Sequence, residues 1–173
     1  LSYRFEIVGR DATEMNYIKI NVYNWLMGAG QCQLFDTAIE GYFFLAECVS
    51  VSESDDGEYS ALDIVFDAYP FKIREVYEGD NLWDTFNFLT DYLQPRTFTS
   101  NGLTTIEFYN PGTVSAIPTV ITSANMEITL DGTSYTFSKG TNKNSDFKLK
   151  PGINKMILEG TGTVEFRFNS EVL

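Results

Sequence analysis

The 173-residue sequence contains no histidine. Histidine is the commonest general base and the commonest metal ligand in proteins, so its absence removes the usual serine-hydrolase triad and many metal centres. A phosphate-binding loop is also missing, because Gly160-Thr161-Gly162 lacks the lysine and the helix that such loops require. We therefore expect a protein that is not an enzyme and that holds no cofactor or metal ion.

Cysteine and long apolar runs are scarce as well. The two cysteines, Cys32 and Cys48, make neither a disulfide framework nor a metal-binding spacing, so we expect two buried free thiols. Apolar runs stay far below the length that spans a bilayer, and the first residues do not resemble a signal peptide, which predicts no membrane insertion. The chain opens at Leu1 inside a strand-like run, so we expect further residues before it.

Basic residues are few, and the net charge is unevenly distributed along the chain. The sequence has 24 acidic and 12 basic residues, a net charge of -12, and no segment basic enough to neutralise a row of phosphates. Residues 1–100 hold 17 acidic and 6 basic residues, whereas residues 101–173 hold 7 and 6. These counts argue against a grip on nucleic acid, and they indicate that the two halves face different surroundings or do different jobs.

Aromatic residues, in contrast, are plentiful. Fourteen Phe and ten Tyr favour β-sheets, where flat side chains fit a pleated, half-buried surface. One helix is predicted: Asp11 can cap its start with Glu14 three residues on, and Gly28 ends it. A single apolar face is expected to pack on the core, formed by Met15, Ile18, Val22, Trp25 and Leu26.

The first half also predicts strands. Residues 3–7 alternate apolar and charged side chains, and 42–51 and 61–68 read as a hairpin, with Pro70 ending its second strand. The acidic segment 52–58 joins them, with Asp56-Gly57 as the tight corner. A calcium loop is an alternative for this segment, but the ordered ligand spacing of such loops is missing, so a solvated hairpin tip is preferred.

The second half predicts a compact antiparallel β-sandwich. Residues 82–93 fit both a helical face and a strand alternation, and we treat them as part of a connector. A turn at Ser100-Asn101-Gly102 opens the second half, and Asp131-Gly132 is a strong hairpin corner. Gly160 to Gly162 is expected to separate two strands, and the short strands expected are 104–109, 119–122, 126–130, 135–137, 147–149, 156–158 and 164–168.

Two other functional classes stay open at this point. A carbohydrate-binding or adhesin module would use aromatic faces such as Tyr109, Tyr135 and Trp83 to stack on sugar rings, although aromatics in a small sandwich are more often core. A glycosidase would need two carboxylates in one cleft. The acidic residues of the second half sit mostly at alternating strand positions that face water; the candidates are Glu107, Glu127, Asp131 and Glu165.

Several short motifs, taken in order, resemble the distal tail proteins of long-tailed bacteriophages. The resemblance spans the whole chain, and its weight lies in the order of the motifs. The segments that carry it are 24–28 (NWLMG), 33–36 (QLFD), 42–46 (YFFLA), 62–72 (LDIVFDAYPFK), 83–88 (WDTFNF), 106–112 (IEFYNPG), 151–154 (PGIN) and 166–168 (FRF).

This resemblance implies a mainly β protein with one helix, organised as the latter part of a ring-forming β domain (1–80), a connector (81–100) and a galectin-like antiparallel β-sandwich (101–173). It implies a structural role in the virion: a hexameric ring at the tail tip, assembled in the bacterial cytoplasm. The expected partners are the tail tube protein and tail-tip or receptor-binding proteins, and phage DNA would pass through without specific binding. Galectin sugar sites use histidine and tryptophan, and residues 101–173 contain neither.

The acidic first half gains a candidate meaning from this resemblance. Several copies of an acidic domain around a channel would repel passing DNA from the wall. The alternative is that these carboxylates lie on solvated outer faces and serve solubility. The candidates for channel-facing or interface positions are Asp55, Asp56, Glu58, Asp63 and Asp67.

Overall fold

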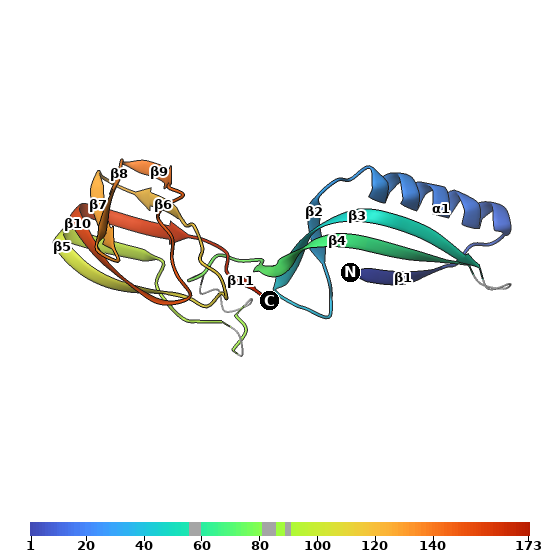
Figure 1. Ribbon diagram of the computed structural model, residues 1–173, viewed down its shortest axis with the longest axis horizontal. Coiled ribbons are helices and arrows are strands. Elements are labelled where there is room, and N and C mark those ends of the chain that lie inside the picture. The colour runs from blue at the N-terminus through green and yellow to red at the C-terminus, as the bar shows by residue number, and fades with distance from the viewer. Residues whose placement is uncertain (56–59, 81–85, 89–90) are drawn as a thin grey trace. The chain divides into compact units, whose positions relative to one another are not determined.

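The computed structural model describes residues 1–55, 60–80, 86–88 and 91–173 (Figure 1). Two compact units result, Leu1–Lys72 and Ile73–Leu173, so the described residues of the predicted connector 81–100 belong to the second unit. The mainly β class with one helix is confirmed. The elements are β1 (Ser2–Ile7), α1 (Ala12–Met27), β2 (Cys32–Phe35), β3 (Tyr42–Asp55), β4 (Ser60–Arg74), β5 (Thr97–Asn110), β6 (Thr119–Thr122), β7 (Met126–Leu130), β8 (Thr133–Phe137), β9 (Gly140–Lys143), β10 (Gly152–Arg167) and β11 (Glu171–Val172).

The first unit is an antiparallel sheet in the order β1-β4-β3-β2, and α1 packs on one face of it. The predicted helix is confirmed at both ends: the Asp11 side chain accepts a hydrogen bond from the backbone N–H of Glu14 at 2.9 Å, and Gly28 caps the other end. Four of the predicted face residues contact the buried residues of the sheet, namely Met15, Ile18, Val22 and Leu26.

Two sequence expectations for this unit are wrong. Trp25 was placed on the core face of the helix, yet 70% of it is exposed. It stands about 100° around the helix from Leu26, and a single sheet covers only a narrow stripe of a helix. Cys48 is buried as expected, but Cys32 is exposed, because it lies on β2 at the edge of the sheet.

The expectation that Pro70 ends a strand is also wrong, since β4 continues through it to Arg74. Leu1 and Phe66 exchange backbone hydrogen bonds, so even-numbered residues of β4 turn their N–H groups toward β1. The strand β1 reaches no further along β4 than this pair. At position 70 the missing N–H therefore removes no bond to β1, which is the condition under which sheets tolerate proline.

The second unit is organised around one long hairpin of β5 and β10. The two strands pair along their whole length, from Gly152 opposite Asn110 to Glu165 opposite Thr97. On its other side, β10 pairs first with β7 and then with β6, which carry β8 and β9 as outer strands. Figure 1 shows β6 to β9 beside the curved β5–β10 pair. Because β10 bends between its pairing with β7 and its pairing with β6, the two halves of the sheet face each other, and their side chains form one core, as in a β-sandwich.

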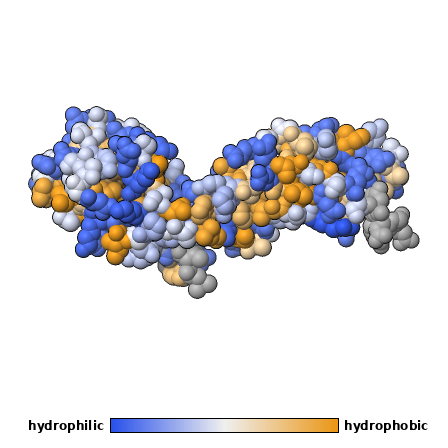
Figure 2. All heavy atoms as spheres, viewed as in Figure 1, coloured by the Kyte–Doolittle hydropathy of each residue, from blue (hydrophilic) through white to orange (hydrophobic). Residues whose placement is uncertain are grey.

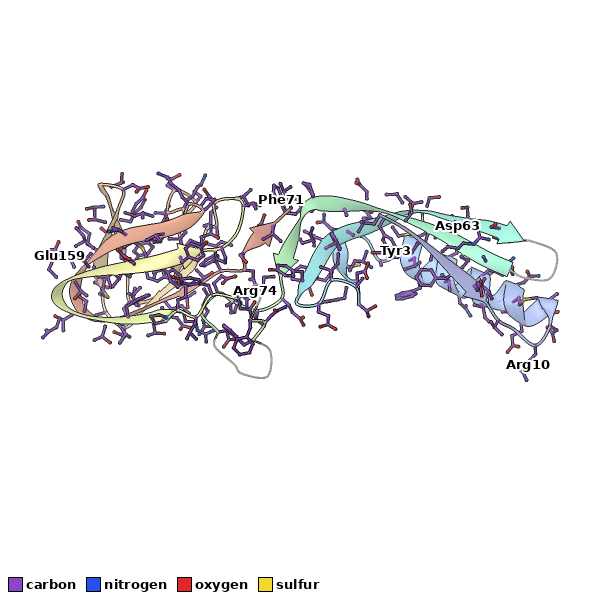
Figure 3. All side chains as sticks on the ribbon, turned by 90° about the horizontal axis from the view of Figure 1, so that it is seen from below. Tyr3, Arg10, Asp63, Phe71, Arg74 and Glu159 are labelled. Atoms are coloured by element: carbon purple, nitrogen blue, oxygen red, sulfur yellow. The ribbon has the colours of Figure 1, made fainter. Side chains whose placement is uncertain are left out.

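Glycines make this curvature possible, and they correct the prediction. The sequence placed a turn at Ser100-Asn101-Gly102 and a strand break at Gly160 to Gly162, but both segments lie inside the continuous strands β5 and β10. Gly102 pairs directly with Gly160, and these residues have φ of 104° and 129°. Positive φ is a conformation that glycine reaches without steric strain, so the ladder bends sharply here without breaking. Figure 3 labels Glu159 at this bend.

Other predicted features of the second unit are confirmed. Strands β6 and β7 have the predicted bounds, and Asp131 and Gly132, both with positive φ, form the two-residue turn between β7 and β8. The segment 147–149 is not a strand and contributes only one bridge, between Leu149 and Ala116. Phe147 and Leu149 nevertheless point inward and are fully buried. The sequence pattern therefore predicted correctly which side chains are buried, but it predicted the wrong secondary structure for them.

A buried ionic cluster, which the sequence analysis missed, holds the start of the second unit. Arg74 places one nitrogen 3.1 Å from the Glu78 carboxylate and another 2.7 Å from Asp91. The hydroxyl of Ser170 donates to Glu78 at 2.6 Å, and the Asn169 amide donates to the backbone oxygen of Arg74. Burial raises the pKa of Glu78, which the bonds from Ser170 and Arg74 only partly offset.

Candidate assembly surface

The helix α1 exposes five large apolar side chains outside its core stripe, and they flank that stripe on both sides: Trp25 lines a groove beside β1, and the Met27 sulfur lies 4.0 Å from the sulfur of Cys48. We call these residues the helix face: Tyr17, Ile20, Tyr23, Trp25 and Met27, which are 64%, 54%, 50%, 70% and 41% exposed. The other exposed positions beyond the first turn are Asn16, Asn21 and Asn24. Figure 2 shows hydrophobic residues spread over the surface of this unit. Single exposed apolar residues are common on proteins, whereas several on one helix are a candidate for a site of interaction.

The helix face carries no charge, although the unit around it is strongly acidic. Lys19 is the only charged residue between Met15 and Phe35, and it is buried, with its Nζ 2.9 Å from a carboxylate oxygen of Glu53. Residues 1–72 as a whole hold 12 acidic and 4 basic residues. The cores of protein–protein interfaces contain few charged residues and are enriched in Tyr, Trp and Met. The helix face is therefore the best candidate for a protein contact.

A groove of about 440 Å³ runs between α1 and β1 beside the helix face. Its walls are apolar side chains of β1, α1, β2 and β4, and Trp25 belongs both to the groove and to the helix face. Two residues of its rim protrude strongly, Phe5 with 52% and Val8 with 87% exposure. The residues that the structure describes thus leave the core of the first unit uncovered along one side of the helix.

Tyr3 is fixed at the groove by a polar contact. Its hydroxyl donates to the Asp36 carboxylate at 2.9 Å, and its ring lies edge-on to Phe66. Burial, followed by the bond to Asp36, raises the pKa of Tyr3. The backbone N–H of Ala38, followed by the Tyr3 hydroxyl, lowers the pKa of Asp36. Both groups are therefore held in their ordinary ionisation states at neutral pH, and the contact orients the Tyr3 ring along the groove wall.

The predicted acidic residues lie on the opposite face of the sheet. Leu62, Ile64 and Phe66 of β4 point to the helix side, so the alternating positions Asp63 and Asp67 point away from it. Asp63, labelled in Figure 3, has an oxygen 3.7 Å from a nitrogen of Arg4, and Asp67 is exposed. The structure brings these two carboxylates to one face.

The other three acidic candidates are not joined to that face by the structure. Asp55 ends β3 with its backbone described, while its side chain, Asp56 and Glu58 lie outside the described residues, as does the predicted corner at Asp56-Gly57. A channel-facing or interface position for any of the five stays a prediction.

The residues considered for sugar stacking are engaged within the second unit. Tyr135 lies edge-on to Phe147 at 5.2 Å between ring centroids, and its hydroxyl donates to the backbone oxygen of Asp146. Tyr109 packs on Tyr92 at 4.5 Å. Trp83 lies outside the described residues. Neither described ring is a free platform for a sugar.

The four carboxylates considered for hydrolysis occupy separate surface positions. Glu107, Asp131 and Glu165 lie in ion pairs with Lys155, Lys150 and Arg167 respectively, and Arg167 lowers the pKa of Glu165. Glu127 lies on β7 opposite Glu159 of β10. Over the residues that the structure describes, no group of three carboxylate or cysteine side chains is placed to hold a metal ion, and none of its helices is long and apolar enough to cross a membrane.

Comparison with known proteins gives a likeness among solved structures. No family model and no curated protein matches the chain. Among solved structures, the chain is similar to the crystal structure of the Dit protein of phage SPP1, which is described as a paradigm of the hub adsorption apparatus in phages that infect Gram-positive bacteria. The TM-score is 0.59, with 13% sequence identity over 99% of this chain and 78% of that chain.

The likeness is one of fold. It extends over both units of the chain, so it agrees with the family resemblance of the sequence motifs at the level of architecture. At 13% identity it does not assign roles to single residues. The roles of the helix face and of the groove must therefore be argued from their own chemistry.

Proposed function

We propose that this protein is a structural component of a phage tail tip. The observation that carries the proposal is the fold similarity to the SPP1 hub protein over 99% of the chain. The apolar, uncharged helix face supports it, because a structural protein acts through contacts with other proteins. The activity is then one of geometry and attachment, and it requires no catalytic group.

The finer form of the proposal is a ring of six copies. A ring needs a heterologous contact, in which two different patches of neighbouring copies meet and the rotation closes. Copies of a unit with 12 acidic and 4 basic residues repel one another, and the helix face is where two of them can approach with the least repulsion. In this proposal the ring joins the tail tube protein to tail-tip or receptor-binding proteins in the virion, after assembly in the bacterial cytoplasm.

The acidic face of β4 fits this proposal as a channel wall. Asp63 and Asp67 share one face of the sheet, opposite the helix, so a ring that turned this face inward would present like charge to DNA. The duplex would then pass without binding. A structure of the assembled ring that placed both carboxylates on its outer surface would contradict this part of the proposal.

The test of the ring is the mass of the full chain in solution, measured by light scattering over a range of concentrations, with electron-microscope class averages of the same sample. We expect a hexamer with a central hole. Tyr23→Asp, which puts a charge in the helix face, should lose the hexamer, whereas the matched control Asp67→Asn on the other side of the sheet should keep it. A chain that shows no ring at any concentration, or a hexamer that tolerates Tyr23→Asp, contradicts the assignment.

A further inference from the structure

The second unit carries a pocket of about 470 Å³ whose lining is mainly polar. Its walls come from segments that lie far apart in the sequence, within residues 73–77, 115–119 and 167–171, together with Lys143. The volume lies in the range of small-molecule sites, which are concave and hold a ligand through a few well-placed polar groups. The groove beside α1 in the first unit is apolar, so the two hollows suit different ligands.

Three neighbouring strands, β10, β6 and β9, place two cations at this pocket (Figure 1). Arg167 lies directly opposite Thr119, and Thr119 lies opposite Lys143. Directly paired residues share one face of a sheet, so the Cα atoms of the two cations are about 10 Å apart on one face. The adjacent pair, Val120 and Phe166, is fully buried, so this row points outward. The pocket therefore has a cation on either side of a threonine.

The guanidinium of Arg167 is held in one orientation. Its Nε and one terminal nitrogen donate to the two carboxylate oxygens of Glu165 at 2.8 and 3.0 Å, and an Arg96 nitrogen lies 3.0 Å from the same carboxylate. The second terminal nitrogen of Arg167 takes no part in these bonds, so it keeps its N–H donors for a ligand. A donor that is already ordered loses little conformational entropy on binding.

Lys143 differs from Arg167 because it makes no ion pair with the residues that the structure describes. The lining also contains the carboxylate of Glu171, so two cations stand against one anion in a chain whose net charge is -12. Bonds between an ammonium group and a carboxylate are shorter and stronger than bonds between neutral groups. A negative group of a ligand is therefore best placed beside Lys143.

An aromatic ring and an oriented amide complete the lining. Tyr77 and Ile117 are 42% and 37% exposed, and they supply apolar surface. The Asn169 amide nitrogen donates to the backbone oxygen of Arg74 at 2.9 Å, which fixes the amide. Sugars have C–H faces that pack on aromatic rings, and their hydroxyl groups both donate and accept hydrogen bonds. Aromatic surface together with fixed polar groups is therefore a lining that suits a sugar.

We propose that this pocket binds an acidic glycan, whose sugar units carry carboxylates as well as hydroxyl groups. The carboxylate pairs with Lys143 and with the remaining N–H groups of Arg167. The hydroxyl groups bond to Thr119 and Asn169, and one sugar ring packs on Tyr77. The tyrosines considered above for sugar stacking do not line this pocket. The inference adds a binding activity to the proposed structural role and uses a different unit from the helix face, so either can fail without the other.

Isothermal titration calorimetry of the full chain at low ionic strength compares three probes: the trimer of galacturonic acid, the trimer of galactose with the same linkage, and the tripeptide of glutamate. The first two differ in their carboxylates, and the third has carboxylates without sugar hydroxyls. We expect the galacturonic acid trimer to bind about tenfold more tightly than either of the others. No binding of this trimer, or equal binding of the galactose trimer, overturns the proposal. Equal binding of the peptide also overturns it, since the pocket would then be a site for acidic protein segments.

A substitution of the lysine tests the role of its charge. Lys143→Gln should weaken binding of the galacturonic acid trimer about tenfold and leave the galactose trimer unchanged. Lys148→Gln is the matched control, because it makes the same change of charge at an exposed lysine of the same unit that does not line the pocket. It should leave both affinities unchanged. Equal effects of the two substitutions would show that net charge sets the affinity, and would overturn the site.

A substitution of the tyrosine tests the sugar ring. Tyr77→Ala should weaken both sugar trimers by a similar factor, about fivefold, because ring packing does not depend on the carboxylate. The thermal unfolding midpoint of the same sample shows whether the variant is folded, which we expect because Tyr77 is 42% exposed. Sugar affinities that survive Tyr77→Ala in the folded chain would place the sugar elsewhere and overturn the proposal.

Discussion

The two units of this chain have the same kind of strands but very different cores. The second unit buries a cluster of fourteen hydrophobic residues, among them Phe147 and Phe166 with no exposed surface. Among its described residues, the first unit buries only six in its cluster, and the most exposed of these are Phe66 at 8% and Ile7 at 9%. The second unit is closed by its own strands, whereas the described residues of the first leave apolar surface uncovered.

The cause of the difference is what covers each sheet. In the second unit, β10 bends at Gly160, with β7 paired to it before the bend and β6 after the bend. The two parts of the sheet therefore face each other, and their side chains meet in one core. In the first unit, one helix covers one face of the sheet, and the groove stays open beside it. A lone helix on a twisted sheet cannot cover the whole face.

The largest effect should come from emptying the closed core. Phe166→Ala removes a ring with no exposed surface that contacts Phe108 and Phe147, and we expect a loss of about 4 kcal/mol. Phe66→Ala in the first unit should lose clearly less, because Phe66 lines the groove and the cavity left by its ring would open toward it. Native-state hydrogen exchange, read separately for each unit, measures both. Equal losses would remove the distinction between a closed and an open core.

Breaking the buried ionic cluster should come next. Arg74→Met leaves the fully buried Glu78 and the nearby Asp91 without their cation, and we expect a loss of about 3 kcal/mol in the second unit. Arg4→Met is the matched control, since its pair with Asp63 is exposed and should contribute less than about 1 kcal/mol. Chemical denaturation followed by circular dichroism tests both, and similar losses for the two variants would contradict the role of burial.

The bend of the long hairpin gives a smaller effect. Gly160→Ala meets two difficulties, a φ of 129° and a new methyl group 3.3 Å from the backbone oxygen of Asn125, so we expect a loss of about 2 kcal/mol. Gly102→Ala has positive φ but nothing within 4 Å of the added carbon, and should lose about 1 kcal/mol. Thermal unfolding compares them. A larger loss of stability in Gly102→Ala than in Gly160→Ala would show that the close approach of Gly160 to Asn125 is not the reason for glycine at the bend.

The contributions of Glu78 and Glu165 to the stability of the second unit should change with pH in opposite directions. Burial raises the pKa of Glu78, so its contribution to stability is present below the ordinary value near 4.5 and is lost as pH rises through the raised value. The Arg167 side chain lowers the pKa of Glu165, so its contribution is present above that ordinary value and is lost as pH falls through the lowered value.

Difference measurements isolate the two groups. As pH falls from neutrality, the wild-type chain should gain stability relative to Glu78→Gln. Relative to Glu165→Gln, it should lose stability once the pH drops below the ordinary carboxyl value. Urea unfolding at a series of pH values gives both curves. Two curves of the same slope would show that one of the pKa directions is wrong.

The sequence predicted local structure well where local chemistry decides it. The cap at Asp11, the end at Gly28 and the two-residue turn at Asp131-Gly132 depend on neighbouring residues, and all three are confirmed. Gly102 and Gly160 were misread as turns, because a glycine signals an unusual backbone conformation without saying whether the strand ends or bends.

What covers a residue could not be predicted from periodicity. Trp25 fits the apolar stripe of the helix, but its exposure depends on how far the sheet extends beneath it. The pairing of Arg74 with Asp91 joins two residues that are far apart in the sequence, and no local pattern encodes such a contact. Of the candidate surface, the apolar helix residues were visible in the sequence, while the groove between α1 and β1 appeared only with the structure.

The smallest effect on stability should accompany the largest effect on assembly. Trp25→Ser removes a side chain that is 70% exposed, so the isolated first unit should change by no more than about 0.5 kcal/mol. In an interface the same aromatic side chain would be a dominant contact, because buried Trp and Tyr carry much of the binding free energy. In the Trp25→Ser variant, hydrogen exchange should therefore show unchanged protection of the first unit, whereas light scattering of the full chain should show that association is lost. If Trp25→Ser instead destabilised the unit and left its association intact, the open core would be a feature of the fold alone, and the contrast between the two units would not reflect assembly.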